Sequence, residues 1–172
     1  MDKTTVTKDL ENKTLTIERV FDAPKEKLWR AYADKTWFEQ WWGPEGWQTT
    51  TKEFNFTIGG KIHYGMKCVD ENQGEWYGKE SWGLMEIQTI DEPNSLTVKD
   101  YFSDAEGTID KSMPSQTFVI ELKEENNGTR LISRSVLETT EQLEQLIAMG
   151  MVEGFSSSAN KLEKLLREQT EK

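Results

Sequence analysis

Residues 140–167 read TEQLEQLIAMGMVEGFSSSANKLEKLLR, and this stretch decides the fold of the 172-residue chain. Apolar and small side chains recur in it at steps of three and four, which is the spacing of one helix face. These residues are Leu143, Ile147, Met151, Gly154, Ser158, Leu162 and Leu165. Thr139 and Gln142 fit a capping box at its start. We therefore predict one long helix, from Thr140 to about Arg167, that lies on a sheet.

The middle of that helical face carries small residues. Gly150, Gly154 and the three serines at 156–158 interrupt the apolar positions. Each glycine destabilises a helix interior by about 1 kcal/mol relative to alanine, so their presence needs a reason. Two interpretations stay open. Either the middle is hollowed to leave volume between helix and sheet, or the glycines allow the helix to pack closely on the sheet.

Strand-like sequence precedes the helix. A first run, rich in β-branched residues, spans 14–21, and the polar residues 1–12 before it are expected to be loose. Six more runs follow, separated by turn sequences such as Gly59-Gly60 and Asn127-Gly128. These runs are 48–57, 60–69, 76–90, 95–103, 116–123 and 129–137.

Two short helices are expected between the first and second of these strands. Pro24 suits a helix start, Asp34 can cap a second helix, and Gly43-Pro44 ends it. The resulting order is one strand, two helices, six strands and one helix. This order predicts an α+β fold with one antiparallel sheet and helices segregated at its ends. We expect a single domain over residues 13–168.

Charge and composition exclude several classes of protein. The chain has 21 Lys and Arg against 31 Asp and Glu, a net charge of −10, which repels nucleic acids and anionic membrane surfaces. One cysteine, Cys68, and one histidine, His63, exclude a disulfide framework and metal sites with two imidazoles. No apolar run approaches the roughly 18 residues of a membrane span, and the N-terminus shows no signal sequence. We expect a soluble, cytoplasmic protein without metal, cofactor, nucleic-acid partner or membrane insertion.

The sequence assigns no catalytic residue. His63 and Cys68 lie on opposite faces of one strand, and we expect His63 on the solvent side. The nucleophile-elbow, P-loop and zinc-protease motifs do not occur. Asp100, set among apolar neighbours, is a weak acid–base candidate. If it faces inward, its pKa should rise. If the register differs by one residue, it faces water, and this is the interpretation we favour.

Two further segments have more than one interpretation. Four of the seven tryptophans, Trp37, Trp41, Trp42 and Trp47, lie within eleven residues. They could close one end of a cavity, form a docking patch or fill the core beneath the helix pair. We favour core packing with partial contact to a cavity. Residues 104–115 are polar and acidic and suit a flap or a mobile surface loop, of which we favour the loop.

Several segments, taken in order, resemble one known family. They are LTIERVFDAP at 15–24 followed by LWRA at 28–31, WWGP at 41–44, FTIGG at 56–60, GLMEI at 83–87, GTRL at 128–131, and the closing Met149-Gly150, Gly154-Phe155, Leu162 and Leu165-Leu166. Over residues 13–168 the chain is similar to the domains of activator of Hsp90 ATPase homologue 1-like (AHSA1-like) proteins. These belong to the START-like, or SRPBCC, helix-grip superfamily.

The resemblance implies a curved antiparallel sheet that grips the C-terminal helix, as in START and Bet v 1-like proteins. It also implies a cavity for an apolar molecule such as a lipid, sterol, flavonoid or polyketide, so the leading hypothesis is a non-enzymatic carrier or sensor. The candidate ligand-binding residues are Trp42, Tyr64, Met66, Met85, Phe102, Phe118, Ser133, Ser135, Met151, Phe155 and Ser158. Two alternatives stay open: a module that docks on the Hsp90 chaperone, or a cyclase or lyase that uses Asp100 on a polyketide-like substrate.

Overall fold

One antiparallel sheet organises the chain. The computed structural model describes residues 4–169. Within that range the strands follow the order β1-β2-β8-β7-β6-β5-β4-β3, and every neighbouring pair is antiparallel. The strands are β1 Thr4–Asp9, β2 Thr14–Phe21, β3 Trp47–Phe54, β4 Lys61–Cys68, β5 Glu80–Asp91, β6 Ser95–Ser103, β7 Gln116–Glu125 and β8 Gly128–Val136.

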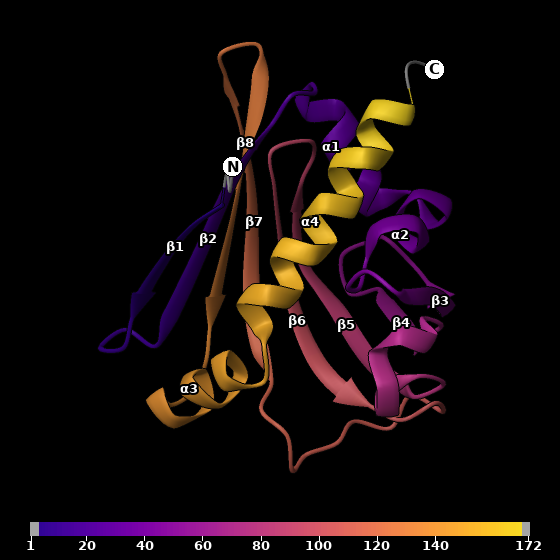
Figure 1. Cartoon of the computed structure of the whole chain (residues 1–172). Coiled ribbons are helices and arrows are strands. Elements are labelled where there is room, and N and C mark those ends of the chain that lie inside the picture. The colour runs from indigo at the N-terminus through magenta and orange to yellow at the C-terminus, as the bar shows by residue number, and fades with distance from the viewer. Residues whose placement is uncertain (1–3, 170–172) are drawn as a thin grey trace.

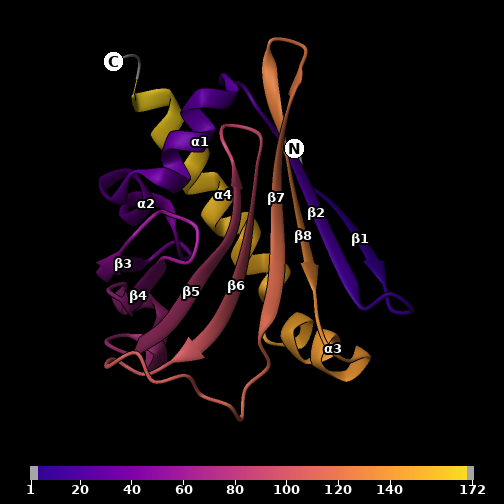
Figure 2. The same cartoon turned by 180° about the vertical axis from the view of Figure 1, so that it is seen from behind.

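Helices lie on one face of this curved sheet. α4 (Met151–Glu168) crosses the sheet diagonally, and α1 (Lys25–Ala33) and α2 (Lys35–Trp41) lie beside its C-terminal half (Figure 1). Seen from behind, the strands lie in front of α4 (Figure 2). The short helices follow the strand at 14–21, as the sequence predicts. The arrangement is the predicted helix-grip fold.

The sheet begins earlier than the sequence predicts. The expectation of a loose segment over residues 1–12 is wrong for Thr4–Asp9, which form β1 and pair along β2, with Val6 opposite Ile17. A run of threonine and valine favours extended backbone. Because β1 is mostly exposed, it lacks the apolar alternation by which a buried strand is detected. Residues 1–3 lie outside the described range.

The predicted single helix over 140–167 is also wrong. α3 (Thr140–Ala148) ends before Gly150, and α4 begins after it. Gly150 has a φ of +97°, a left-handed conformation that costs other residues about 1–2 kcal/mol. Glycine therefore permits a turn here, and α3 lies at one end of the sheet while α4 crosses it (Figure 1). A smaller difference concerns the run 76–90, since 71–76 form the 3₁₀ helix η1 and β5 starts at Glu80.

Apolar packing and a partly buried ion pair hold α4 on the sheet. The core forms two clusters, a larger one around Phe38 and a smaller one around Leu15, and α4 contributes to both. Arg19 of β2 is 5% exposed, and its Nη2 donates to Asn160 Oδ1 and Glu163 Oε1 of α4 at 2.9 Å each. Between residues 4 and 169, no helix is both long and apolar enough to cross a membrane.

Candidate functional site

A cavity of about 270 Å³ lies between the sheet and α4. Five strands, α1, α2, the turn after α2 and α4 contribute to its walls, so segments far apart in the sequence meet there. The lining residues are Ile17, Tyr32, Trp41, Trp42, Gly43, Pro44, Tyr64, Met66, Asp100, Gln116, Phe118, Ile120, Ser133, Ser135, Met151, Gly154, Phe155 and Ser158. Mostly apolar walls with a few convergent polar groups are typical of small-molecule sites.

The structure brings nine of the eleven candidate ligand-binding residues to this cavity. They are Trp42, Tyr64, Met66, Phe118, Ser133, Ser135, Met151, Phe155 and Ser158. Met85 and Phe102 are placed elsewhere, which corrects their prediction. Met85 is packed in the larger core, 3% exposed, and Phe102 borders a second cavity of about 60 Å³. Alternation along a strand predicts which face a residue occupies, but not where the helix stands away from the sheet.

Five large side chains of the wall were not among the candidate ligand-binding residues, although Trp41 belongs to the tryptophan cluster expected to contact a cavity. They are Ile17, Tyr32, Trp41, Gln116 and Ile120. Alternation offered a signal for the two β7 residues, because Gln116 and Ile120 lie two positions on either side of Phe118 and share its face. The side chains from α1 and α2 had no such signal, because they reach the cavity only through the way the helices pack.

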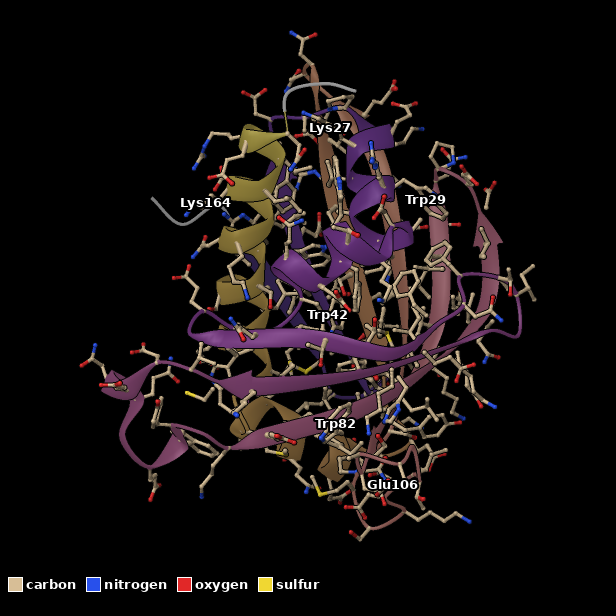
Figure 3. The ribbon with its side chains drawn as sticks, turned by 90° about the vertical axis from the view of Figure 1, so that its right-hand side faces the viewer. Lys27, Trp29, Trp42, Trp82, Glu106 and Lys164 are labelled. Atoms are coloured by element: carbon tan, nitrogen blue, oxygen red, sulfur yellow. The ribbon has the colours of Figure 1, made fainter. Side chains whose placement is uncertain are left out.

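The tryptophan-rich segment fills the core beside the cavity. Trp37 and Trp41 are 7% and 3% exposed, and the Trp41 indole N–H donates to the Ala31 carbonyl oxygen at 2.8 Å. Trp42 stacks on Phe38, with ring centroids 5.0 Å apart, and lies inside the molecule in Figure 3. Core packing with partial cavity contact is therefore confirmed for this part of the segment, whereas Trp47 lies outside both core clusters, with its ring centroid 6.4 Å from that of the exposed Trp76. The indoles of Trp37, Trp41 and Trp42 form no surface patch for docking.

Asp100 faces the cavity, which corrects the interpretation that it faces water. Its Oδ1 and Oδ2 lie 3.0 and 3.3 Å from the Tyr64 hydroxyl, which donates to the carboxyl group. Tyr64 lies across Gly83 of β5, where a Cβ atom would clash with the phenol ring. Gly83 thereby lets the Tyr64 hydroxyl reach Asp100 on β6. The register of β5 against β6 sets the face of Asp100.

Burial controls the protonation of this pair. It raises the pKa of Asp100 to about 7, while hydrogen bonds from Tyr64 and Gln116 act in the opposite direction. Burial, followed by the nearby Asp100 carboxyl group, raises the pKa of Tyr64 well above its ordinary value. Near neutral pH, the cavity therefore contains a carboxyl group that readily gains or loses a proton beside a neutral phenol.

His63 lies on the opposite face of the sheet and is buried there, so its expected solvent exposure is wrong. It is 6% exposed, its Nε2 lies 3.0 Å from the Asp104 carbonyl oxygen, and its ring centroid lies 5.1 Å from that of Trp82. The 104–115 segment lies against its ring, because a Cβ atom on Gly107 would stand 3.7 Å from His63 Cε1, and Lys52 Nζ holds this segment by donating to the Ala105 carbonyl oxygen at 2.6 Å. Figure 3 shows Trp82 on the other side of the strands from Trp42. His63 therefore takes no part in the cavity.

The turn between α2 and β3 is tied to α4. Lys161 Nζ lies 3.3–3.4 Å from three backbone carbonyl oxygens of this turn, those of Gly43, Pro44 and Trp47. The Glu45 backbone N–H donates to the Ser157 hydroxyl oxygen at 2.7 Å. Burial lowers the pKa of Lys161, and the charge of Glu45 opposes that shift. These contacts hold the Gly43-Pro44 wall of the cavity against the last helix.

The two glycines of the final helices should respond oppositely to alanine. A Cβ atom on Gly154 would meet nothing within 4 Å, so the helix face is hollowed here and Gly154→Ala should stabilise the protein by about 1 kcal/mol. Gly150→Ala should destabilise it by about 1–2 kcal/mol, because of the left-handed backbone. Urea unfolding followed by circular dichroism measures both changes. A loss of stability in Gly154→Ala would show that the helix packs closely on the sheet.

Comparison with known proteins agrees with this geometry. The chain is similar to protein Ms6760 from Mycobacterium smegmatis, at 33% identity and a TM-score of 0.84 over 95% of this chain and 96% of that one. It is also similar to proteins from Arthrobacter aurescens, at 30% identity and 0.86 over 96% and 92% of the chains, and from Staphylococcus epidermidis, at 30% identity and 0.80 over 98% and 96%. No curated protein sequence matches significantly.

The family itself follows from the sequence match. Residues 22–167 match the family described as activator of Hsp90 ATPase homolog 1-like protein, and the match spans most of the chain, from the end of β2 to the last turn of α4. The fold, the cavity and this match agree. The chain belongs to the activator of Hsp90 ATPase homolog 1-like family, AHSA1, with a START-like helix-grip fold.

Proposed function

We propose that the protein is a carrier or sensor that binds an apolar small molecule, such as a lipid, sterol, flavonoid or polyketide, in the cavity under α4. The observation that supports this proposal is the cavity of about 270 Å³ with mostly apolar walls. An apolar cavity of about 150 Å³ holds benzene, so this one corresponds to about two such rings. Family membership agrees, because helix-grip domains enclose a cavity of this kind between sheet and helix.

Filling the cavity should abolish ligand binding. Met151 lines the cavity from the start of α4, and Met151→Trp would place an indole in it. The wild-type protein is screened by thermal shift against the four ligand classes. A ligand at about 100-fold excess over its Kd should stabilise it by about 2.7 kcal/mol, or roughly 5–10 °C. Met151→Trp should lose this shift.

The matched control is Met149→Trp. Met149 is 51% exposed at the end of α3, outside the cavity, so the same added bulk should leave the shift intact. A ligand that stabilises Met151→Trp as much as wild type binds elsewhere. A screen with no hit in any class would contradict the proposal.

An enzymatic function is the second candidate, favoured by one observation. Asp100 faces the cavity with a pKa raised to about 7 by burial, which suits a general acid or base near neutral pH. A cyclase or lyase acting on a polyketide-like substrate would use it to move a proton. Such an enzyme should convert a ligand found in the screen, and Asp100→Asn should lose turnover while retaining binding.

A further inference from the structure

The inner end of the cavity is a cluster of three polar side chains from three strands. Tyr64 of β4, Asp100 of β6 and Gln116 of β7 meet there, and all three also border the second cavity of about 60 Å³. They form the partition between the two cavities. Any ligand that enters the larger cavity fully brings one end against this partition.

The Tyr64 hydroxyl, a hydrogen-bond donor at this end, is already used. Tyr64 donates its hydroxyl proton to Asp100, with its oxygen 3.0 Å from Asp100 Oδ1. Trp41 is likewise occupied by the Ala31 carbonyl oxygen. In each of these interactions a donor of the cavity wall is paired with an acceptor of the protein itself.

Hydrogen-bond acceptors at this end of the cavity still lack donors. Within residues 4–169, Gln116 Oε1 is buried without a hydrogen-bond partner, and a carboxylate accepts more hydrogen bonds than the Tyr64 hydroxyl supplies. An unpaired buried acceptor is costly, so a ligand that donates to it gains the most. No Lys, Arg or His is found among the cavity-lining residues of the described chain, so nothing there would neutralise a carboxylate ligand.

We propose that this end of the cavity is a subsite for a hydrogen-bond donor, best filled by the protonated amine of an otherwise apolar ligand, and that it discriminates against carboxylates. The inference rests on the proposed function and specifies its ligand class. An ammonium group placed beside Asp100 and Gln116 Oε1 supplies the missing donors and pairs the buried charge. A fatty acid or aryl carboxylate would instead face the Asp100 carboxylate and Gln116 Oε1, which are hydrogen-bond acceptors like the ligand's own carboxylate.

Binding of such a ligand should depend on pH. Asp100 ionises around pH 7, and an alkyl amine stays protonated well above that pH, so amine affinity should rise with pH. The other titratable groups facing the cavity are Tyr32 of α1 and Tyr64 of β4, and burial raises the pKa of both. Tyr101 borders only the second cavity. Asp100 is therefore the group that should set the pH profile.

Three two-ring probes of matched size test the subsite. They are 2-(aminomethyl)naphthalene, 2-naphthoate and uncharged 2-methylnaphthalene, with Kd measured by ligand-detected NMR between pH 5.5 and 8.5. At pH 8.5 the amine should bind about tenfold to a hundredfold more tightly than the carboxylate. From pH 5.5 to 8.5 its affinity should rise by about tenfold or more, and that of naphthoate should fall.

Two variants test whether Asp100 causes the amine preference and its pH dependence. Asp100→Asn should remove both the amine preference and the pH dependence. Glu106→Gln makes the same charge change on an exposed residue of the 104–115 segment, far from Trp42 in Figure 3, and should keep both. Naphthoate binding as tightly as the amine, or a flat pH profile in wild type, overturns the inference while cavity binding stands. Failure of all three probes, the uncharged one included, contradicts the proposed function as well.

Discussion

Asp100→Asn should stabilise the ligand-free protein at pH 8, and this gain should shrink as the pH falls towards 4. The pKa of Asp100 is about 7 in the folded protein, against an ordinary value of 3.8. The folded state therefore holds a proton that the unfolded state releases, and wild-type stability falls as the pH rises from about 4 to 7. Above pH 7 Asp100 is ionised in both states and destabilises the folded protein by its full amount. Asparagine is uncharged at every pH and has no such effect.

The size of this gain is bounded by the pKa shift. A pKa shift of this size corresponds to a gain in unfolding free energy of at most about 4 kcal/mol. Because Asp100 also borders the cavity, we expect a gain of about 2 kcal/mol. Urea unfolding of both proteins at pH 4.5, 6 and 8 gives the difference at each pH, with Glu106→Gln as the charge-matched control. Parallel stability profiles for wild type and Asp100→Asn would show that Asp100 is ionised as readily as in the unfolded chain.

Trp41→Ala should destabilise the protein by about 3–5 kcal/mol. Trp41 is 3% exposed, its ring packs edge-on against Tyr32 and Trp42, and its loss would leave the Ala31 carbonyl oxygen without its donor. Trp42→Ala should cost less, about 1–2 kcal/mol, because Trp42 is half-buried and borders the existing cavity.

Comparing the two variants shows how much each side chain contributes to stability and to ligand binding. Urea unfolding followed by circular dichroism compares the two free energies of unfolding, and thermal shift shows whether either retains ligand binding. Equal costs for Trp41→Ala and Trp42→Ala would contradict the deeper burial of Trp41, since both side chains border the cavity.

Most of the fold could be predicted because its signals are local. Turn sequences such as Asn127-Gly128 separate the strands, Asp34 caps α2 by accepting from the Thr36 and Trp37 backbone N–H groups, and Thr139 caps α3. β1 escaped prediction because an exposed strand needs no apolar alternation. The helix break at Gly150 escaped it because the spacing of apolar residues continues on both sides of the turn.

The sequence predicts on which face of the sheet a candidate residue lies, but not whether that residue reaches the cavity. Ser133, Ser135 and Phe118 follow from strand alternation. The exclusion of Met85 depends on where α4 leaves the sheet, and the orientation of Asp100 depends on the register of β5 and β6. Both are long-range properties that one strand's sequence does not contain. The acceptor character of the inner end depends on hydrogen bonds between three strands, so only the structure shows it.

The place of β2 within the sheet has a consequence for folding during synthesis. β2 pairs with β8, and Thr129 Oγ1 donates to the Ala23 carbonyl oxygen 106 residues earlier in the chain. The apolar face of β2 therefore leaves the ribosome long before β8 and α4 exist to cover it. Closing so long a loop is entropically slow and leaves apolar surface exposed meanwhile. The nascent chain should thus stay open to aggregation, and to chaperone binding, until nearly the whole domain has been made.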